Sequence, residues 1–236
     1  MLKIKVLGSS SYGNCYLLSY NNETLILDCG ISVKEIKKRL NFNISSVVGV
    51  LATHSHKDHC LSENELRKMG ISVFKPYEVR VCGETPKQLT MTYGSFQIKA
   101  FNLPHNGTIN YGFLIAVGGQ KILYMTDFEY CEYVFKKVKV DHMLIECNYQ
   151  LELVNRDLPN YEHKIRGHCS FDTCKTFIDV NKTEKLKTIL LLHLGADTCN
   201  AMECVENIKN IVEGNVYVNY ARKGLEIELK EDICPF

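Results

Sequence analysis

The chain has 236 residues, with 28 Lys and Arg against 27 Asp and Glu, so its formal net charge is +1. This balance does not imply a partner recognised through a broad positive field. The length is sufficient for one large domain with a buried core. No apolar run approaches the roughly 18 residues of a membrane span, and the first residues lack the apolar core and cleavage site of a signal peptide. We therefore expect a globular protein without a membrane partner.

The cysteines indicate the redox environment. There are 11, an odd number, and they show no repeated spacing. This pattern argues against a secreted disulfide framework and predicts reduced thiols in the cytoplasm. No pair has the Cys-x-x-Cys spacing of a structural zinc site, so the sequence assigns none. Cys29 and Cys60 are interpreted as packed small residues rather than as metal ligands.

Short apolar runs separated by turn residues predict a sheet-rich mixed fold. In chain order, the predicted strands are 2–7, 15–20, 24–28, 47–53, 71–74, 96–101, 111–117, 121–126, 142–147, 187–193, 216–220 and 225–229. The predicted helices are 32–40, 62–69, 129–138, 170–180 and 198–212. Ser32 and Ser62, each followed three residues later by Glu, predict capping boxes at two helix starts. No Pro/Gly/Ser-rich linker interrupts the chain. Residues 1–236 are therefore expected to form a single domain, in which two packed sheets carry helices outside.

Directly after the apolar run 47–53, the segment from His54 to His59 reads His-Ser-His-Lys-Asp-His. In an extended segment, residues 54, 56 and 58 project to one side, so two imidazoles and a carboxylate converge there. His59 approaches from another direction as the chain turns toward the next helix. Catalytic zinc usually takes three protein ligands plus water, so four candidate ligands indicate two ions sharing this segment. The alternative is a polar turn, but three of the chain's eight histidines lie here beside an Asp, which favours ligation.

Three further candidate ligands follow other predicted strands. His105, Asp127 and His193 each lie just beyond an apolar run. Sheets of the α/β type place their sites at such strand ends. Any one of the three, taken alone, would more often be a cap or a satisfied polar residue. Together with the segment 54–59, they are interpreted as part of one metal site.

The pattern His-x-His-x-Asp-His, followed by His, Asp and His, resembles that of the metallo-β-lactamase superfamily over nearly the full chain. The resemblance implies a four-layer αββα sandwich of class α/β. It also implies that the early carboxylate Asp28 braces the ligand loop. The implied ligands are His54, His56 and His105 for the first metal and Asp58, His59 and His193 for the second, with Asp127 bridging the two.

Within the superfamily, the chain is similar to YycJ-like (WalJ-like) proteins, which are regarded as exonuclease-type phosphodiesterases. The matching segments are Gly8–Cys15, Ile145–Asn148, Gly167–Ser170 and His193–Gly195. Two places depart from that pattern, both where substrate would be read: the usual Asn-His pair is Asn148-Tyr149, and Gly195–Cys199 replaces an Asn-rich turn. The Gly8–Cys15 loop offers backbone N–H groups to an anion, or it is only a Gly-rich turn.

Phage anti-Pycsar cyclic-nucleotide phosphodiesterases are a second, more distant resemblance through the same core ligands. Those enzymes imply a homodimer in which a loop of the partner helps to line the pocket.

The resemblance implies two divalent metal ions with a hydroxide between them as the nucleophile, since metal coordination lowers the pKa of water. Asp58 would accept the proton of that hydroxide while ligating. His168 is the predicted proton donor or phosphate ligand, and a structural histidine at a helix start is the alternative. Imidazole and carboxylate ligands suit Zn²⁺, and Mn²⁺ or Fe²⁺ would also be accommodated. Further candidate substrate contacts are Tyr12, Asn14, Asn148 and Tyr149.

The expected activity is hydrolysis of phosphodiester bonds, either in nucleic acid or in a small, for example cyclic, nucleotide. The near-zero net charge and the 13 tyrosines favour the small substrate, and the family resemblance favours nucleic acid. One alternative is a hydrolase of carbonyl compounds such as a β-lactam or a thioester. The other is a non-catalytic protein that sequesters a nucleotide.

Overall fold

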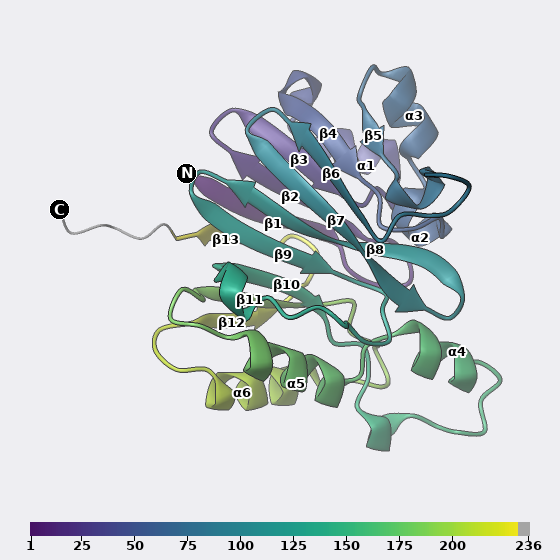
Figure 1. Cartoon of the computed structure of the whole chain (residues 1–236), viewed down its shortest axis with the longest axis vertical. Coiled ribbons are helices and arrows are strands. Elements are labelled where there is room, and N and C mark those ends of the chain that lie inside the picture. Colours follow the sequence, from purple (N-terminus) through teal and green to yellow (C-terminus); the bar gives the residue numbers. More distant parts are fainter. Residues whose placement is uncertain (231–236) are drawn as a thin grey trace.

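Two mixed β-sheets lie face to face, and helices cover their outer faces, as Figure 1 shows for the computed structural model, in which residues 1–230 are described. The first sheet has the strand order β13-β1-β2-β3-β4-β5. Its strands are β1 (Leu2–Gly8), β2 (Cys15–Tyr20), β3 (Glu23–Leu27), β4 (Val47–Leu51), β5 (Val73–Phe74) and β13 (Glu226–Leu229).

The second sheet has the order β12-β11-β10-β9-β8-β7-β6. Strands β9 to β12 are mutually parallel, and β6 to β9 form antiparallel pairs. The strands are β6 (Gln88–Tyr93), β7 (Phe96–His105), β8 (Thr108–Val117), β9 (Gln120–Met125), β10 (His142–Glu146), β11 (Thr188–Leu192) and β12 (Tyr217–Tyr220).

The helices divide between the two outer layers (Figure 1). Near the first sheet lie α1 (Val33–Arg39) and α3 (Glu63–Lys68), and near the second lie α5 (Phe171–Asn181) and α6 (Ala201–Ile211). The short helices α2 (Lys57–Cys60) and α4 (Tyr161–Gly167) belong to connections around the strand ends. This arrangement is the four-layer αββα sandwich that the sequence resemblance implies.

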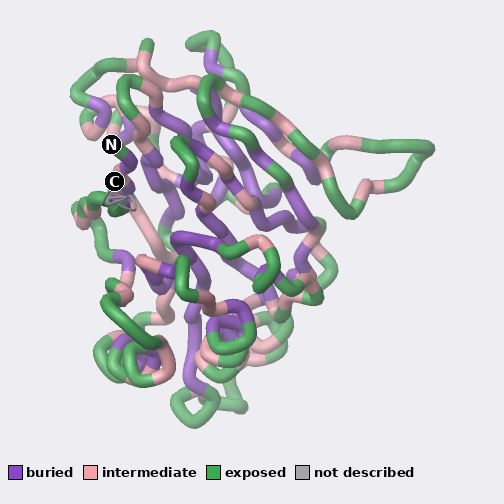
Figure 2. Tube along the Cα trace, turned by 60° about the vertical axis from the view of Figure 1, so that its left-hand side comes forward, coloured by how far each residue is buried: buried purple, intermediate pink, exposed green. Residues whose placement is uncertain are grey.

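Two apolar cores hold these layers together, and Figure 2 shows the buried segments running through the strands. The core between the sheets includes Tyr16 and Phe113, both of which contact the Tyr124 ring. The second core lies between β9–β11 and helices α5 and α6, where Phe177 and Ile208 are buried. Because burial fixes both sheets, their strand ends, and the side chains that follow them, are held at defined positions.

Every predicted strand has a counterpart in the structure, because each was either a compact apolar run or a segment of alternating polar and apolar residues. The predicted helices near 32–40, 62–69, 170–180 and 198–212 are also confirmed. The half-exposed edge strand β6, the short helices α2 and α4 and several 3-10 turns were missed.

The helix predicted at 129–138 is wrong. That segment is irregular except for a 3-10 turn at Lys136–Val138. Its backbone is held by α5 instead: the Phe135 N–H donates to Asn181 Oδ1 at 2.5 Å, and the Phe135 ring contacts Phe177. Tertiary contacts thus override the local helical pattern.

Only one of the two predicted capping interactions is present. The Ser32 hydroxyl accepts from the Glu35 N–H at 3.3 Å, although Glu35 itself pairs with Arg39 instead of closing the box. Ser62 makes no cap, because its hydroxyl donates to the Ile31 carbonyl. Among the described residues, no helix is long and apolar enough to cross a membrane.

Candidate metal centre

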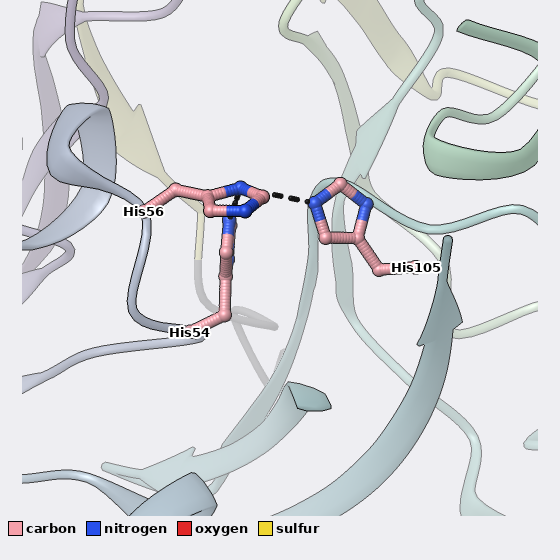
Figure 3. Close-up of side chains that lie close together, drawn as sticks. All are labelled: His54, His56 and His105. Atoms are coloured by element: carbon pink, nitrogen blue, oxygen red, sulfur yellow. Dashed lines mark hydrogen bonds between the residues drawn. The ribbon is translucent and has the colours of Figure 1, made fainter. Parts of the chain in front are cut away.

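Three imidazoles meet at the strand ends (Figure 3). His54 follows β4, His56 precedes α2, and His105 ends β7 of the other sheet. His54 Nε2 and His56 Nδ1 are 2.9 Å apart, and His105 Nε2 and His56 Nδ1 are 3.2 Å apart. Around a tetrahedral zinc ion, with Zn–N near 2.05 Å, two ligand nitrogens are separated by about 3.3 Å. The three rings therefore have the donor chemistry and the spacing to hold one metal ion.

A second group of ligand atoms adjoins the first. His59 Nε2 lies 3.3 Å from Asp58 Oδ2 and 3.3 Å from Asp127 Oδ1. Asp127 Oδ1 is also 2.7 Å from His193 Nδ1, and His193 Nε2 is buried without a hydrogen-bond partner in residues 1–230. An unpaired buried nitrogen on an imidazole whose other nitrogen contacts the Asp127 carboxylate fits a second cation, which would supply the missing partner.

Strand order explains why these residues meet. Strands β9, β10 and β11 are adjacent and parallel, so their carboxyl ends place Asp127, Glu146 and His193 side by side. In the first sheet, β3 and β4 are likewise parallel and end at Asp28 and the His54 segment. Each sheet thus contributes side chains to the centre, and both ligand groups draw on both sheets.

Asp28 lies beneath the first-sheet half and is fully buried. Its carboxylate accepts from the Thr53 N–H at 2.9 Å and from the Tyr124 hydroxyl at 2.6 Å. Asp28 Oδ2 is also 2.8 Å from His59 Nδ1. When Nδ1–H of His59 donates to Asp28, the other ring nitrogen, Nε2, is left to bind a metal. Carboxylates orient metal-binding histidines in this way.

Three residues of the centre have left-handed backbone conformations: Asp28 with φ 54°, Asp127 with φ 52° and His193 with φ 50°. Such angles are uncommon outside glycine and persist where the surroundings enforce them. Each residue directly follows a strand or lies one position beyond it, so the chain turns sharply to aim the side chain into the centre.

The segment 54–59 is not extended, contrary to the sequence-based expectation. Residues 57–60 form α2, so Asp58 and His59 project from a helical turn rather than from a strand. The turn is locked by backbone hydrogen bonds from the Asn14 N–H to the Asp58 carbonyl, at 2.7 Å, and from the Cys29 N–H to the His59 carbonyl, at 2.8 Å. Asp58 and His59 still face the same centre as His54.

Burial and charge set opposite protonation states in the two ligand groups, the half with His54 and His105 and the half with His59 and His193. Burial holds the pKa of His54 well below its usual value, and it also lowers that of His105. Burial opposes charge at His59 and His193, but the carboxylate of Asp127 prevails. It helps raise the pKa of His59 well above the usual value and that of His193 to about 10.

Glu146 lies at the centre, although the sequence motifs assigned it no role. It is fully buried at the end of β10, and Oε1 is 2.8 Å from His168 Nδ1 and 3.2 Å from His193 Nδ1. Oε2 accepts from the backbone N–H groups of Phe128 and Cys169. A carboxylate directly after a buried apolar strand was the signal that could have identified it.

His168 caps the end of α4 and reaches the edge of the metal-ligand cluster, with Nδ1 3.9 Å from Asp127 Oδ2. Its side chain is partly exposed, unlike that of His193. Beside His105 the surface is hollowed, and the lining includes the basic side chains Lys87 and Arg166.

The other predicted substrate contacts have varied positions and stay predictions. Tyr12 is 97% exposed at the tip of its loop. Asn14 is buried against the centre, with Nδ2 2.9 Å from His59 Nε2. Asn148 is also buried, and its amide donates to the His193 carbonyl at 2.8 Å. Tyr149 is nearly buried and pairs with Ser170.

Comparisons with known proteins agree with this geometry. The family model described as "Metallo-beta-lactamase superfamily" matches residues 10–68. The chain is 26% identical to the exodeoxyribonuclease YycJ of Bacillus anthracis, covering 96% of this chain and 92% of that protein. It is 24% identical to the exodeoxyribonuclease WalJ of Streptococcus pneumoniae serotype 2 (strain D39 / NCTC 7466), covering 83% and 82%.

Among solved structures, the metallo-beta-lactamase fold protein YhfI from Bacillus subtilis superposes with a TM-score of 0.70 at 18% identity. That match covers 96% of this chain and 98% of YhfI. The family model, the relatives and the shared fold lead to one conclusion. Residues 10–68 match the metallo-beta-lactamase superfamily model, and the chain as a whole has the metallo-beta-lactamase fold.

Proposed function

We propose that this protein is a metal-dependent hydrolase that cleaves phosphodiester bonds and uses two divalent metal ions. The observation that carries the proposal is the pair of adjoining ligand groups. The three imidazoles of His54, His56 and His105 face one another at 2.9 and 3.2 Å. Beside them, the carboxylates of Asp58 and Asp127 each lie 3.3 Å from His59 Nε2. One group alone would suit a single ion, and the two together suit a dinuclear centre.

The proposed ligands are assigned by position. His54, His56 and His105 would hold one ion, and Asp58, His59 and His193 would hold the other, with Asp127 between them. When bound, such ions lower the pKa of water and polarise a phosphoryl oxygen. Imidazole and carboxylate donors without thiolate favour Zn²⁺ and also accept Mn²⁺ or Fe²⁺.

His168 is proposed to protonate the departing alkoxide. Glu146 accepts a hydrogen bond from Nδ1–H of His168 at 2.8 Å. The other ring nitrogen, Nε2, is then the one that exchanges a proton with the substrate. The partly exposed ring stands at the edge of the ligand cluster, where a substrate would enter. Glu146 acts here as a positioning residue.

The hollow beside His105 supports a substrate with phosphate groups on either side of the cleaved bond. Lys87 and Arg166 line it and could pair with phosphates, as in sites that track a nucleic-acid backbone. The named activity of the YycJ and WalJ relatives supports the same choice. Nucleic acid is therefore the first proposed substrate, and a small nucleotide is the second.

A test begins with metal analysis of the purified full-length chain. The protein would then be assayed on single-stranded DNA, RNA, cyclic mononucleotides, cyclic dinucleotides and a thioester. We expect about two metal ions in this centre and turnover of a phosphodiester. The variant Asp127→Asn should lose activity and the metal of this centre. Asp141→Asn serves as the matched control, because Asp141 is a buried aspartate directly before the start of β10, at the end opposite to the centre.

Two outcomes would reject the proposal. One is a fully metal-loaded protein that turns over no phosphodiester. The other is turnover of the thioester alone, which would favour a carbonyl hydrolase. Tight nucleotide binding without turnover would indicate a sequestering protein. The cytoplasmic location and the homodimer stay predictions, which fractionation and sedimentation would check.

A further inference from the structure

A second cluster of candidate metal ligands lies outside the proposed catalytic centre. Its members are Cys147, directly after β10, Cys199, in the connection after β11, and Cys204, in α6. Their three Sγ atoms all lie within 4.8 Å of one another, and those of Cys199 and Cys204 are 3.5 Å apart. Residues far apart in sequence are thus joined at one point.

The separations suit a shared metal ion. With Zn–S near 2.3 Å, two thiolates on a tetrahedral zinc ion are about 3.8 Å apart. The Cys199–Cys204 separation of 3.5 Å is close to that value, and the other two separations do not exceed 4.8 Å. All the sulfurs therefore lie where one ion could contact them with small side-chain adjustments.

The surroundings suit a closed site. Cys147 and Cys204 are fully buried, and Cys199 is half-buried. A fourth buried thiol, Cys174 of α5, interacts with Cys147. Three thiols, from the end of β10, a loop and α6, lie within reach of one ion, and Cys174 would complete the Cys₄ composition of structural zinc sites only after a side-chain shift.

A cation stands beside the cluster. Lys164 Nζ donates to Asn148 Oδ1 at 3.0 Å and to Thr198 Oγ1 at 3.2 Å, and these residues directly adjoin Cys147 and Cys199. Lys164 is about half-buried, so its charge is only partly screened. A metal held by three or four thiolates carries net negative charge, which a neighbouring ammonium stabilises.

We propose that Cys147, Cys199 and Cys204 form a structural site for a zinc-class divalent ion, with Cys174 moving in as the fourth ligand on binding. On binding, each ligating thiol releases one proton to solvent and forms a metal–sulfur bond, and no electron is transferred. The ion would tie the connection after β11 and the start of α6 to the end of β10. Because Glu146 and Asn148 flank Cys147, the site would also brace the catalytic centre from behind.

Cobalt substitution distinguishes the two kinds of site. A Co²⁺–thiolate bond gives a near-ultraviolet charge-transfer band that imidazole and carboxylate ligands do not give, so the full-length chain loaded with Co²⁺ should show it. The double variant Cys199→Ser/Cys204→Ser should lose the band and about one metal ion per chain. Cys131→Ser, a half-buried thiol outside the cluster, is the matched control and should keep both.

The variant Asp127→Asn separates this proposal from the catalytic one, because it should lose activity and keep the band. Absence of the band in the wild-type protein would overturn the proposal, and that measurement does not depend on whether a variant folds. An unchanged band and metal content in the double variant would also overturn it. So would a Cys199–Cys204 disulfide, found by mass spectrometry of the metal-loaded protein.

Discussion

Hydrogen bonds on the outer side of two candidate ligands, His105 and His59, set the direction in which each ring points. His105 Nδ1 is 2.6 Å from the Gly167 carbonyl and donates to it, so Nε2 faces His56. His59 is fixed in the same way by Asp28. Such outer partners fix the tautomer and the ring orientation, which pre-organises the site for metal binding.

The His168 and Glu146 pair makes a prediction for single residues. His168→Ala should reduce kcat about 100-fold or more, because general acid catalysis contributes on that order. Metal content should not change, because His168 is not a proposed ligand. Glu146→Gln should reduce kcat about 10-fold, since outer partners tune rather than supply the chemistry. Steady-state kinetics with metal analysis of each variant would measure both effects.

His163→Ala is a suitable control for that series, because its ring lies 5.8 Å from that of His168 and pairs with Asn106 at the surface. It should change kcat little. Unchanged kcat in His168→Ala would remove the proton-donor role.

Protonation predicts unequal metal affinity in the two halves. Because their pKa values are lowered, His54 and His105 stay neutral at moderately acidic pH and bind a metal without releasing protons. His59 and His193, whose pKa values are raised, are protonated in the metal-free protein and must release protons on binding. Lowering the pH from about 8 to about 6 should therefore weaken the Asp127–His193 half first.

Calorimetric titration in buffers of different ionisation enthalpy would count the protons released at each binding step. Release at one step only is the expected outcome. Equal proton release at both steps, or parallel loss of both metals on acidification, would contradict the assignment.

At the scale of elements, close packing of three loops positions α2. A Cβ on Gly30 would lie 1.6 Å from the Asp58 carbonyl oxygen and 2.7 Å from the His59 nitrogen. The Gly30 N–H also donates to the Asn14 carbonyl at 2.9 Å. Only glycine allows the loop after β3 to approach α2 this closely, so Gly30 determines where Asp58 and His59 lie.

Gly30→Ala should displace α2 and remove the metal held by Asp58 and His59. Gly119→Ala is the matched control, because Gly119 has φ +77° at the β8–β9 turn and nothing lies within 4 Å of an added Cβ. The control should cost about 1–2 kcal/mol of stability from backbone strain and keep both metals. Metal analysis and thermal unfolding would separate the two effects. A Gly30→Ala protein with full metal content would disprove the role of this contact.

At the scale of the whole molecule, the proposed metals connect the two sheets. His54, His56 and His59 come from the first sheet, and His105, Asp127 and His193 come from the second. Ions that bind only the folded chain stabilise it by mass action, by about 2.7 kcal/mol at a hundredfold excess over Kd. We propose that the chain unfolds as a single domain whose cooperativity the metals reinforce.

Removal of metal with a chelator should therefore lower Tm by roughly 5–10 °C for a chain of this size. The metal-loaded protein should unfold in one transition. Calorimetry before and after chelation would test both statements, with re-addition of metal as the control. An unchanged Tm would show that the metals do not connect the sheets, and two transitions in the loaded protein would show separate domains.

Much of the fold could be predicted from the sequence, because many buried strands have compact apolar sequences. The runs around Leu25 and Leu190 predicted β3 and β11 for this reason. The half-exposed strand β6 was missed because every second residue of Gln88–Tyr93 is polar, so the segment forms no compact apolar run. The segment around Phe135 was misread as a helix because contacts with α5 outweigh its local preference.

The candidate metal ligands were also proposed from sequence, since His54, His56, Asp58 and His59 lie within six positions of one another. Local spacing could not reveal that α2 turns Asp58 and His59 out of an extended path, because Gly30 and Asn14 impose that turn from elsewhere in the chain. It likewise gave no role to Glu146, whose partner His168 is 22 residues away.

The sequence by itself determined the apolar strands, the clustered histidines and the kind of chemistry that their side chains allow, because these depend on residue type and short spacing. Only the tertiary structure decided which strand ends adjoin, and so which side chains meet. The thiols of Cys147, Cys199 and Cys204 show the difference most clearly. Their spacing along the chain matches no metal motif, and they come together only because parallel strands β10 and β11 are neighbours and α6 packs against their sheet.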